Sequence, residues 1–136
     1  MASDALPPWD QMLAVFIGGA IGSLTRFVAG YAFGAWLGAD FPWATLFVNV
    51  AGSAWMGWAG TLLTAKPTAM DPLLRLFLTT GFAGGFTTFS TFAFESWGLF
   101  QRGEPLLGWA NILGNLIVGF VFAYVGIMIA RTQGGI

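Results

Sequence analysis

The sequence contains no cysteine and no histidine, and few of its side chains are charged. Its 136 residues include 5 Lys or Arg and 6 Asp or Glu, which is 8% of the chain and gives a net charge of −1. The missing cysteines exclude disulfides and thiol nucleophiles, and the missing histidines remove the other usual ligand of zinc and haem. Soluble domains carry about 25% charged residues, so this chain has too few to cover a surface in water. The composition indicates a membrane protein.

Basic residues are also too sparse for a nucleic-acid partner. Phosphate binding needs a cluster of Lys and Arg, whereas the five cations here are spread singly along the chain. The sequence also lacks an acid–base pair, a metal-ligand cluster and a nucleophile with its base. We therefore expect no nucleic-acid binding and no enzymatic activity.

Apolar residues are abundant: they make up 57% of the chain, and the mean hydropathy is +0.75. A spanning helix needs about 20 mostly apolar residues. Four segments qualify, over about residues 12–37, 43–65, 73–100 and 106–130. Short connections rich in Gly and Pro separate them. We predict an all-α integral membrane protein with four transmembrane helices and a single domain covering residues 1–136, embedded in membrane lipid.

A bundle of four helices is thin, and a hydrophilic path inside it would leave polar groups facing lipid, so we expect an oligomer. The end that holds the N-terminus carries Lys66, Arg75 and Arg131, and the opposite end carries Arg102. Orientation in the membrane follows the excess of positive charge in the loops, and this excess is small. The charges therefore permit insertion in both orientations and an antiparallel homodimer.

Glycine recurs every four residues in the first predicted helix. Gly18, Gly22, Gly30 and Gly34 lie on one row, and Arg26 occupies the position between them. Glycines on such a row let a neighbouring backbone approach closely, so we interpret them as a packing surface. A charged group inside a span is costly and is usually paired or hydrated. Arg26 is either a residue of a pore mouth or a structural tie.

Three asparagines, Asn49, Asn111 and Asn115, lie inside apolar segments. An amide without a partner in hydrocarbon costs several kcal/mol. These side chains either hydrogen-bond to one another across helices or present their NH2 donors to an anion. The spacing leaves both interpretations open.

The middle of the third segment is poor helix material, because Gly81–Phe92 contains three glycines, three threonines and a serine. Glycine costs about 1 kcal/mol per helical position relative to alanine. A membrane helix can break at such a place if the freed backbone lines a cavity, where carbonyls bind cations and amides bind anions. The electropositive ring edges of Phe89 and Phe92 can contact a small anion, although their spacing alone favours ordinary apolar packing.

At this segment the chain resembles the CrcB or Fluc family of fluoride channels. The resemblance extends from about Val15 to Ala130. It rests on the run from Gly18 to Arg26, on Thr45-Leu46-Phe47-Val48-Asn49-Val50-Ala51-Gly52 and on the run from Gly81 to Phe92. Two features depart from the family's pattern: Ala44 replaces a usual glycine, and Asn111 and Asn115 stand where some relatives use serine.

The resemblance implies a fluoride-selective channel that exports fluoride passively across the bacterial inner membrane. Members form antiparallel, dual-topology homodimers with a broken third helix and two pores, each lined by both subunits. The implied fluoride pathway consists of Phe89, Phe92, Asn49, Thr88, Ser90, Thr91, Asn115 and Asn111. The backbone carbonyls of Gly84 and Thr87 are implied to hold a structural sodium ion, and Arg26 and Glu95 match charged positions of a vestibule or of the structure.

The chemistry agrees with this implication, because fluoride holds its water tightly and needs replacement donors that bind it weakly enough to release it. Two other functions remain open. A small multidrug exporter shares the size and the four spans, but it carries a glutamate in its first span, where this chain has Arg26. A non-transporting assembly or lipid-organising protein would use the glycine rows and would not need the Thr, Ser and Phe run.

Overall fold

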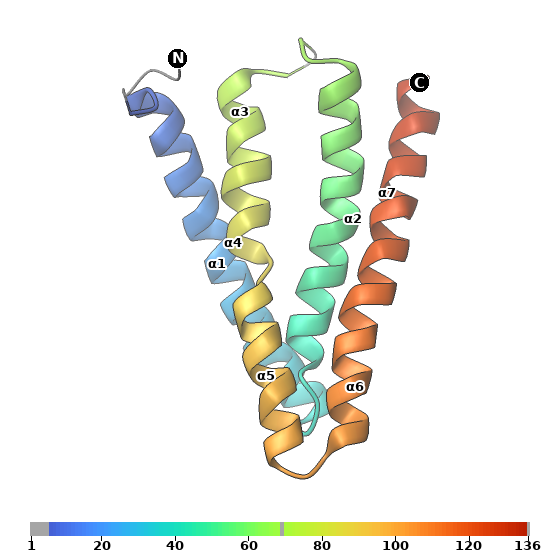
Figure 1. The fold of residues 1–136 in the computed structure, drawn as a ribbon. Coiled ribbons are helices and arrows are strands. Elements are labelled where there is room, and N and C mark those ends of the chain that lie inside the picture. Colours follow the sequence, from blue (N-terminus) through green and yellow to red (C-terminus); the bar gives the residue numbers. More distant parts are fainter. Residues whose placement is uncertain (1–5, 69, 136) are drawn as a thin grey trace.

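The structure is a computed structural model that describes residues 6–68 and 70–135, and the remaining residues of the predicted domain lie outside this description. The described residues form helices and short connections, without a strand among them. The prediction of an all-α protein is confirmed. Figure 1 shows long helices running side by side, with the start of α1, the connection after α2 and the end of α7 at one end of the bundle.

Three helical stretches of the described chain are long and apolar enough to cross a membrane. They are α1 (Trp9–Leu37), α2 (Trp43–Ala65) and a stretch over Pro105–Gly134 that comprises α6 (Pro105–Leu113), the π-helical η2 (Gly114–Val118) and α7 (Gly119–Gly134). The first and last helices extend past the predicted boundaries. Asp10 in the first turn of α1 and Arg131 in the last turn of α7 complement the helix dipoles, so both helices continue beyond their apolar parts.

The remaining predicted span is divided into four elements. These are α3 (Pro72–Leu76), the π-helical η1 (Phe77–Ala83), α4 (Gly84–Phe86) and α5 (Phe89–Gln101). The carboxylate of Asp71 accepts from the backbone N–H groups of Leu73 and Leu74, and Pro72 follows it, so the helix start has both a cap and a favourable first residue. Between α4 and α5 the backbone of Thr87 and Thr88 is extended, with φ/ψ of −86°/160° and −154°/117°.

The glycine row of α1 divides into a packed half and an open half. Gly18 and Gly22 are buried, and a side chain at either position would overlap the backbone of η1 or α4. By contrast, no atom of the described chain lies within 4 Å of the place where a Cβ of Gly30 or Gly34 would be. The packing interpretation is therefore confirmed for the first half of the row only.

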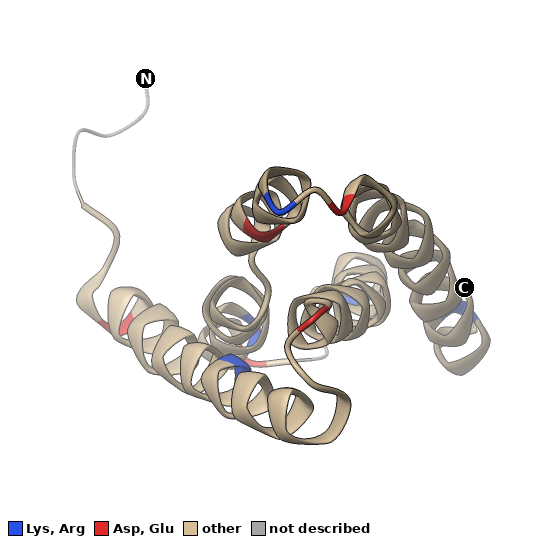
Figure 2. Ribbon diagram, turned by 90° about the horizontal axis from the view of Figure 1, so that it is seen from below, with Lys and Arg blue, Asp and Glu red and all other residues tan. Residues whose placement is uncertain are grey.

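Helices α2 and α7 pack closely in their middle parts. A Cβ on Gly57 would overlap the carbonyl oxygen of Ala123, and a Cβ on Gly126 would overlap that of Ala54. Large apolar side chains point outward from the bundle, as Trp36 (85% exposed) and Phe94 (80% exposed) illustrate. Figure 2 shows that few charged residues lie along the long helices. This surface suits lipid rather than water.

Candidate functional site

Asn49 on α2 holds the extended segment between α4 and α5. Its Oδ1 accepts the backbone N–H of Thr88 at 2.8 Å, and its Nδ2 donates to the carbonyl oxygen of Thr88 at 3.1 Å. The side chain of one asparagine thus satisfies both backbone groups of a residue that has left the helix. Gly52, one turn further along α2, is buried against Thr87. A Cβ at this position would overlap the side chain of Thr87.

This arrangement leaves two carbonyl groups without helical partners. In a continuous helix the N–H of Thr88 would bond to the carbonyl of Gly84, but Asn49 takes that N–H. Likewise the N–H of Thr91 donates to the hydroxyl of Thr88 at 3.2 Å instead of to the carbonyl of Thr87. Within the described residues no hydrogen bond reaches either carbonyl oxygen, and Gly84 is exposed on the surface of the chain.

Three hydroxyl side chains gather at the start of α5. The Thr88 hydroxyl donates to the Oγ1 of Thr91 at 3.0 Å and lies 3.4 Å from the Oγ of Ser90. Because Thr91 accepts in this bond, its own hydroxyl hydrogen remains available, and Ser90 is exposed. The cluster also sits at the N-terminus of a helix, where the macrodipole favours an anion.

The asparagines bond to one another across the bundle. Asn49 donates to the Oδ1 of Asn115 at 2.8 Å, and Asn115 donates to the Oδ1 of Asn111 at 2.9 Å. Asn111 is fully buried and donates to the hydroxyl of Ser96 at 2.9 Å. Both N–H donors of Asn49 are therefore engaged inside the chain, and these contacts support the interpretation of the amides as ties between helices. Their action as donors to fluoride stays a prediction.

Phe89 and Phe92 lie next to one another with their rings in an edge-to-face arrangement, 5.5 Å between centroids. Phe92 is buried at 7% exposure, whereas Phe89 is 76% exposed. Both line a cavity of about 300 Å³ together with Asn49, Ser53, Met56 and Asn115. No charged residue belongs to the lining of this cavity. The two rings thus border a neutral, partly polar space.

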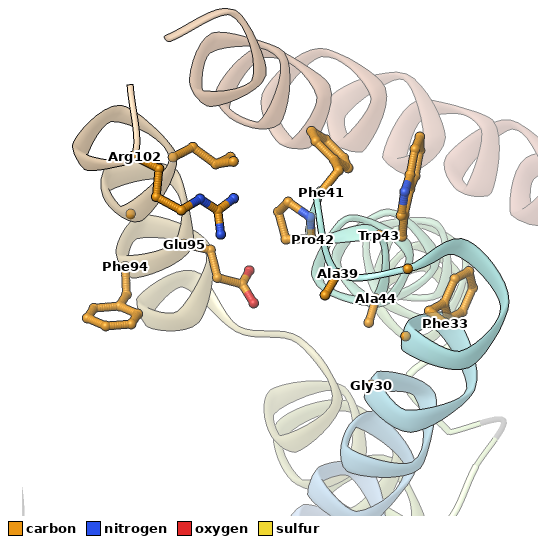
Figure 3. A pocket seen from close by; sticks show the side chains of 14 residues that line it. Gly30, Phe33, Ala39, Phe41, Pro42, Trp43, Ala44, Phe94, Glu95 and Arg102 are labelled. Atoms are coloured by element: carbon orange, nitrogen blue, oxygen red, sulfur yellow. The ribbon is translucent and has the colours of Figure 1, made fainter. Parts of the chain in front are cut away.

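The two charged residues that the sequence singled out lie on the other side of the extended segment. The Nε of Arg26 donates to the carbonyl oxygen of Gly85 at 3.1 Å, so Arg26 ties α1 to the end of α4. The Oε2 atom of Glu95 is buried and receives no hydrogen bond from the described residues. Figure 3 shows the side chains of Glu95, on α5, and of Arg102, directly after α5, extending toward Pro42 and Ala44.

Four cavities follow one another along α2 and share residues. The first, about 730 Å³, is lined by α2 from Met56 to Ala65 and by Arg131. It shares Met56 with the cavity at Phe89 and Phe92, which shares Thr88 with a third cavity of about 600 Å³. The third cavity shares Glu95 with a fourth of about 380 Å³ that reaches Arg102.

This series covers the length needed to cross a membrane. Its lining on α2 runs in order from Ala65 at one helix end to Trp43 at the other. The 23 residues of α2 span about 35 Å, compared with a hydrocarbon core of about 30 Å. The cavities therefore follow α2 from one end to the other, over a length comparable with the hydrocarbon core, with the extended segment near the middle.

The family model of the CrcB-like proteins, described as camphor resistance (CrcB), matches residues 13–127. The chain belongs to the CrcB-like family. Among its relatives is a fluoride-specific ion channel FluC of Nitrobacter winogradskyi, 43% identical over 125 residues that cover 91% of this chain and 98% of the relative. Relatives with the same name in Solibacter usitatus and Thermus thermophilus are 40% and 43% identical, covering 89% and 86% of this chain and 98% and 91% of theirs.

Sequence reasoning did not identify two residues of this CrcB-like site. Thr45 is buried and lines the cavity that holds Glu95 and Thr91, and Ser96 is the buried partner of Asn111. Helical spacing could have indicated both, since Thr45 precedes Asn49 by four residues and Ser96 follows Phe92 by four. The family's motif ends before Ser96, which is why the resemblance alone did not find it.

Proposed function

We propose that this protein is a fluoride-selective channel that lets fluoride leave the cell passively. The relatives that match most of its length are named fluoride-specific ion channels. The observation that carries the proposal is the series of cavities along α2, in which successive cavities share lining residues and two of them border Phe89, Phe92 and the extended segment at Thr88. A passive channel needs such a path and no catalytic group.

The middle of this path is suited to a small anion that has to be released again. The cavity at the phenylalanines has no charged lining, and the donors nearby are ring edges, hydroxyls and the N-terminal amides of α5. Neutral donors replace part of the hydration shell without trapping the ion, as a ring of cations would. In this proposal Phe89 and Phe92 contact fluoride, and Thr88, Ser90 and Thr91 extend the path toward Arg26.

We infer that two copies assemble as an antiparallel homodimer, in which both subunits line each of two pores. One chain leaves several residues of the path open to its outer surface, since Phe89 is 76% exposed and Ser90 and Gly84 are exposed as well. In lipid the hydroxyl of Ser90 and the backbone of Gly84 need a polar neighbour, and a second copy supplies the same groups in return. The small difference in positive charge between the two ends fits insertion in both orientations.

A sodium ion at the centre of this dimer fits the carbonyl groups of Gly84 and Thr87. Both oxygens lack a hydrogen-bond donor in the described chain because Asn49 and Thr88 have taken the amides that would reach them. Bare carbonyls are suitable ligands for a hard cation. The positive charge of the ion would attract the carbonyl dipoles of both subunits, and the break in the third helix would form its binding site.

The protein is a multi-pass membrane protein, and we propose the bacterial inner membrane as its location. The small multidrug exporter is not supported as an alternative. The relatives are named as fluoride channels, and the charged residue within the apolar part of α1 is Arg26, whereas such exporters use a glutamate. The lipid-organising protein does not account for the cavities that meet at Thr88.

The test is an efflux assay with purified protein in liposomes loaded with either fluoride or chloride. We expect rapid fluoride efflux when a potassium ionophore prevents the build-up of a membrane potential. Chloride efflux should be no faster than in protein-free liposomes. Equal efflux of the two ions would contradict selectivity. Uptake of a quaternary amine driven by a pH gradient, without fluoride efflux, would support the exporter instead.

A further inference from the structure

The groove between the outer parts of α2 and α7 contains one charged residue. The helices touch at Gly57, whose Cβ position overlaps the backbone of Ala123, and one turn later Gly60 has no atom within 4 Å. A space of about 730 Å³ opens there. Its walls are apolar apart from Thr61 and Thr64, and Arg131 from the last turn of α7 is the single charged group that lines it.

The hydroxyls in this groove do not compensate the charge of Arg131. Thr61 and Thr64 donate to the carbonyl oxygens of Gly57 and Gly60 on their own helix. In the described part of the chain Arg131 forms no ion pair and no side-chain hydrogen bond. A cation beside low-dielectric walls attracts anions over several ångströms, and such a field raises the local concentration of an incoming ion.

The groove lies next to the cavity at the phenylalanines. Met56 lines both this groove and the cavity that contains Phe89, Phe92 and Asn49. We propose that Arg131 and this groove form an anion-capture site, at which small anions collect before they reach the phenylalanines. The fluoride part of this inference rests on the proposed channel function, whereas anion capture by Arg131 does not.

Arg75 provides a matched control for the charge. It lies in α3 at the same end of the bundle, carries the same charge and lines none of the cavities of the series. If Arg131 acts only through the overall charge of this end, Arg75→Gln and Arg131→Gln will have similar effects on ions in the groove. If Arg131 acts on the groove, the two variants will differ.

The first measurement uses a single cysteine, which is possible because the chain has none of its own. In Met56→Cys, an anionic methanethiosulfonate is expected to react faster than a cationic one of similar size. Adding Arg131→Gln should reduce this preference roughly threefold to tenfold, while Arg131→Lys and Arg75→Gln keep it. About 1 M salt should also remove it, since the Debye length is then about 3 Å.

Three outcomes of this measurement would overturn the capture site. They are no preference for the anionic reagent, a preference that Arg75→Gln reduces as much as Arg131→Gln does, and a thiol that reacts in detergent but not in zwitterionic lipid vesicles. The last result would show that lipid fills the groove.

The second measurement is fluoride efflux at low fluoride. Arg131→Gln is expected to slow it roughly threefold to tenfold at low ionic strength and to leave it unchanged at about 1 M of an impermeant salt. A deficit that is equal at both ionic strengths indicates a structural role and contradicts the proposal. Absence of fluoride efflux from the native protein, with the cysteine preference intact, would instead refute the channel function and leave the anion-capture site standing.

Discussion

The Oδ1 atom of Asn49 accepts the backbone N–H of Thr88 at 2.8 Å, and this bond replaces the helical bond that Thr88 would give to Gly84. The same amide donates to the carbonyl of Thr88 and to Asn115. One side chain therefore holds the extended segment, leaves a carbonyl bare and begins the row of amides that reaches Ser96.

Replacing Asn49 by leucine should release the extended segment. Three hydrogen bonds disappear, and the N–H of Thr88 loses its acceptor, so we expect a loss of about 2–4 kcal/mol of unfolding free energy and no fluoride efflux. Denaturant titration in detergent and the liposome assay measure the two effects. Thr79→Ala is the control, because its hydroxyl bonds only to the carbonyl of Arg75 one turn earlier and Thr79 lines none of the four cavities. A leucine variant as stable as the control would refute the role of Asn49.

Phe89→Ile and Phe92→Ile should both abolish fluoride efflux. Because the two rings differ in burial, the two variants should differ in stability. Phe89 is 76% exposed, so its replacement removes a ring edge from the path at little cost in the folding of one chain. Phe92 is 7% exposed, and we expect its replacement to cost about 1–3 kcal/mol in addition. Thermal unfolding in detergent separates the two. Native efflux from Phe89→Ile would contradict a contact between this ring and fluoride.

The glycine row of α1 should respond differently at its two ends. Alanine at Gly22 has to displace the backbone at Phe82, so we expect a loss of about 1–3 kcal/mol of stability. Alanine at Gly30 meets no atom of the described chain within 4 Å and should increase stability by up to about 1 kcal/mol through its higher helix propensity. Equal losses at both positions, measured by denaturant titration, would show that another helix covers the second half of the row.

The bond between Asn111 and Ser96 should appear as an energetic coupling. Both side chains are buried, and the amide donates to the hydroxyl at 2.9 Å. A double-mutant cycle of Asn111→Ala and Ser96→Ala is expected to give a coupling of about 0.5–2 kcal/mol. A matched cycle of Asn111→Ala with Thr64→Ala, on the outer part of α2, should be additive. Additivity in the first cycle as well would mean that the bond contributes nothing to stability.

Hydropathy and composition predicted the helical stretches well, because apolar length is a property of each segment by itself. The position of the extended backbone was foreseeable for the same reason, since the glycines and hydroxyls between Gly81 and Phe92 weaken a helix locally. The first half of the glycine row was also predictable as packing. Its open half was not, because whether Gly30 is covered depends on where the neighbouring helix ends.

The partners of the polar side chains required the structure. The sequence left open whether the asparagines bond to one another or face an anion, and spacing within a helix cannot decide this. The bond from Asn49 to Thr88 joins residues 39 apart in the chain, so it depends on how far α2 is shifted along its axis relative to the segment between α4 and α5. The same holds for the shared lining of the cavities by Met56, Thr88 and Glu95.

The carbonyl of Gly84, which receives no hydrogen bond from the described residues and belongs to an exposed residue, has a consequence for how the protein is made. A chain that has entered the bilayer alone carries this dipole toward hydrocarbon, where an unsatisfied backbone group costs several kcal/mol. If the protein forms the proposed dimer with its cation, pairing of newly made chains and uptake of the ion would remove this cost in one event. The yield of mature protein would then rise steeply with the rate of synthesis.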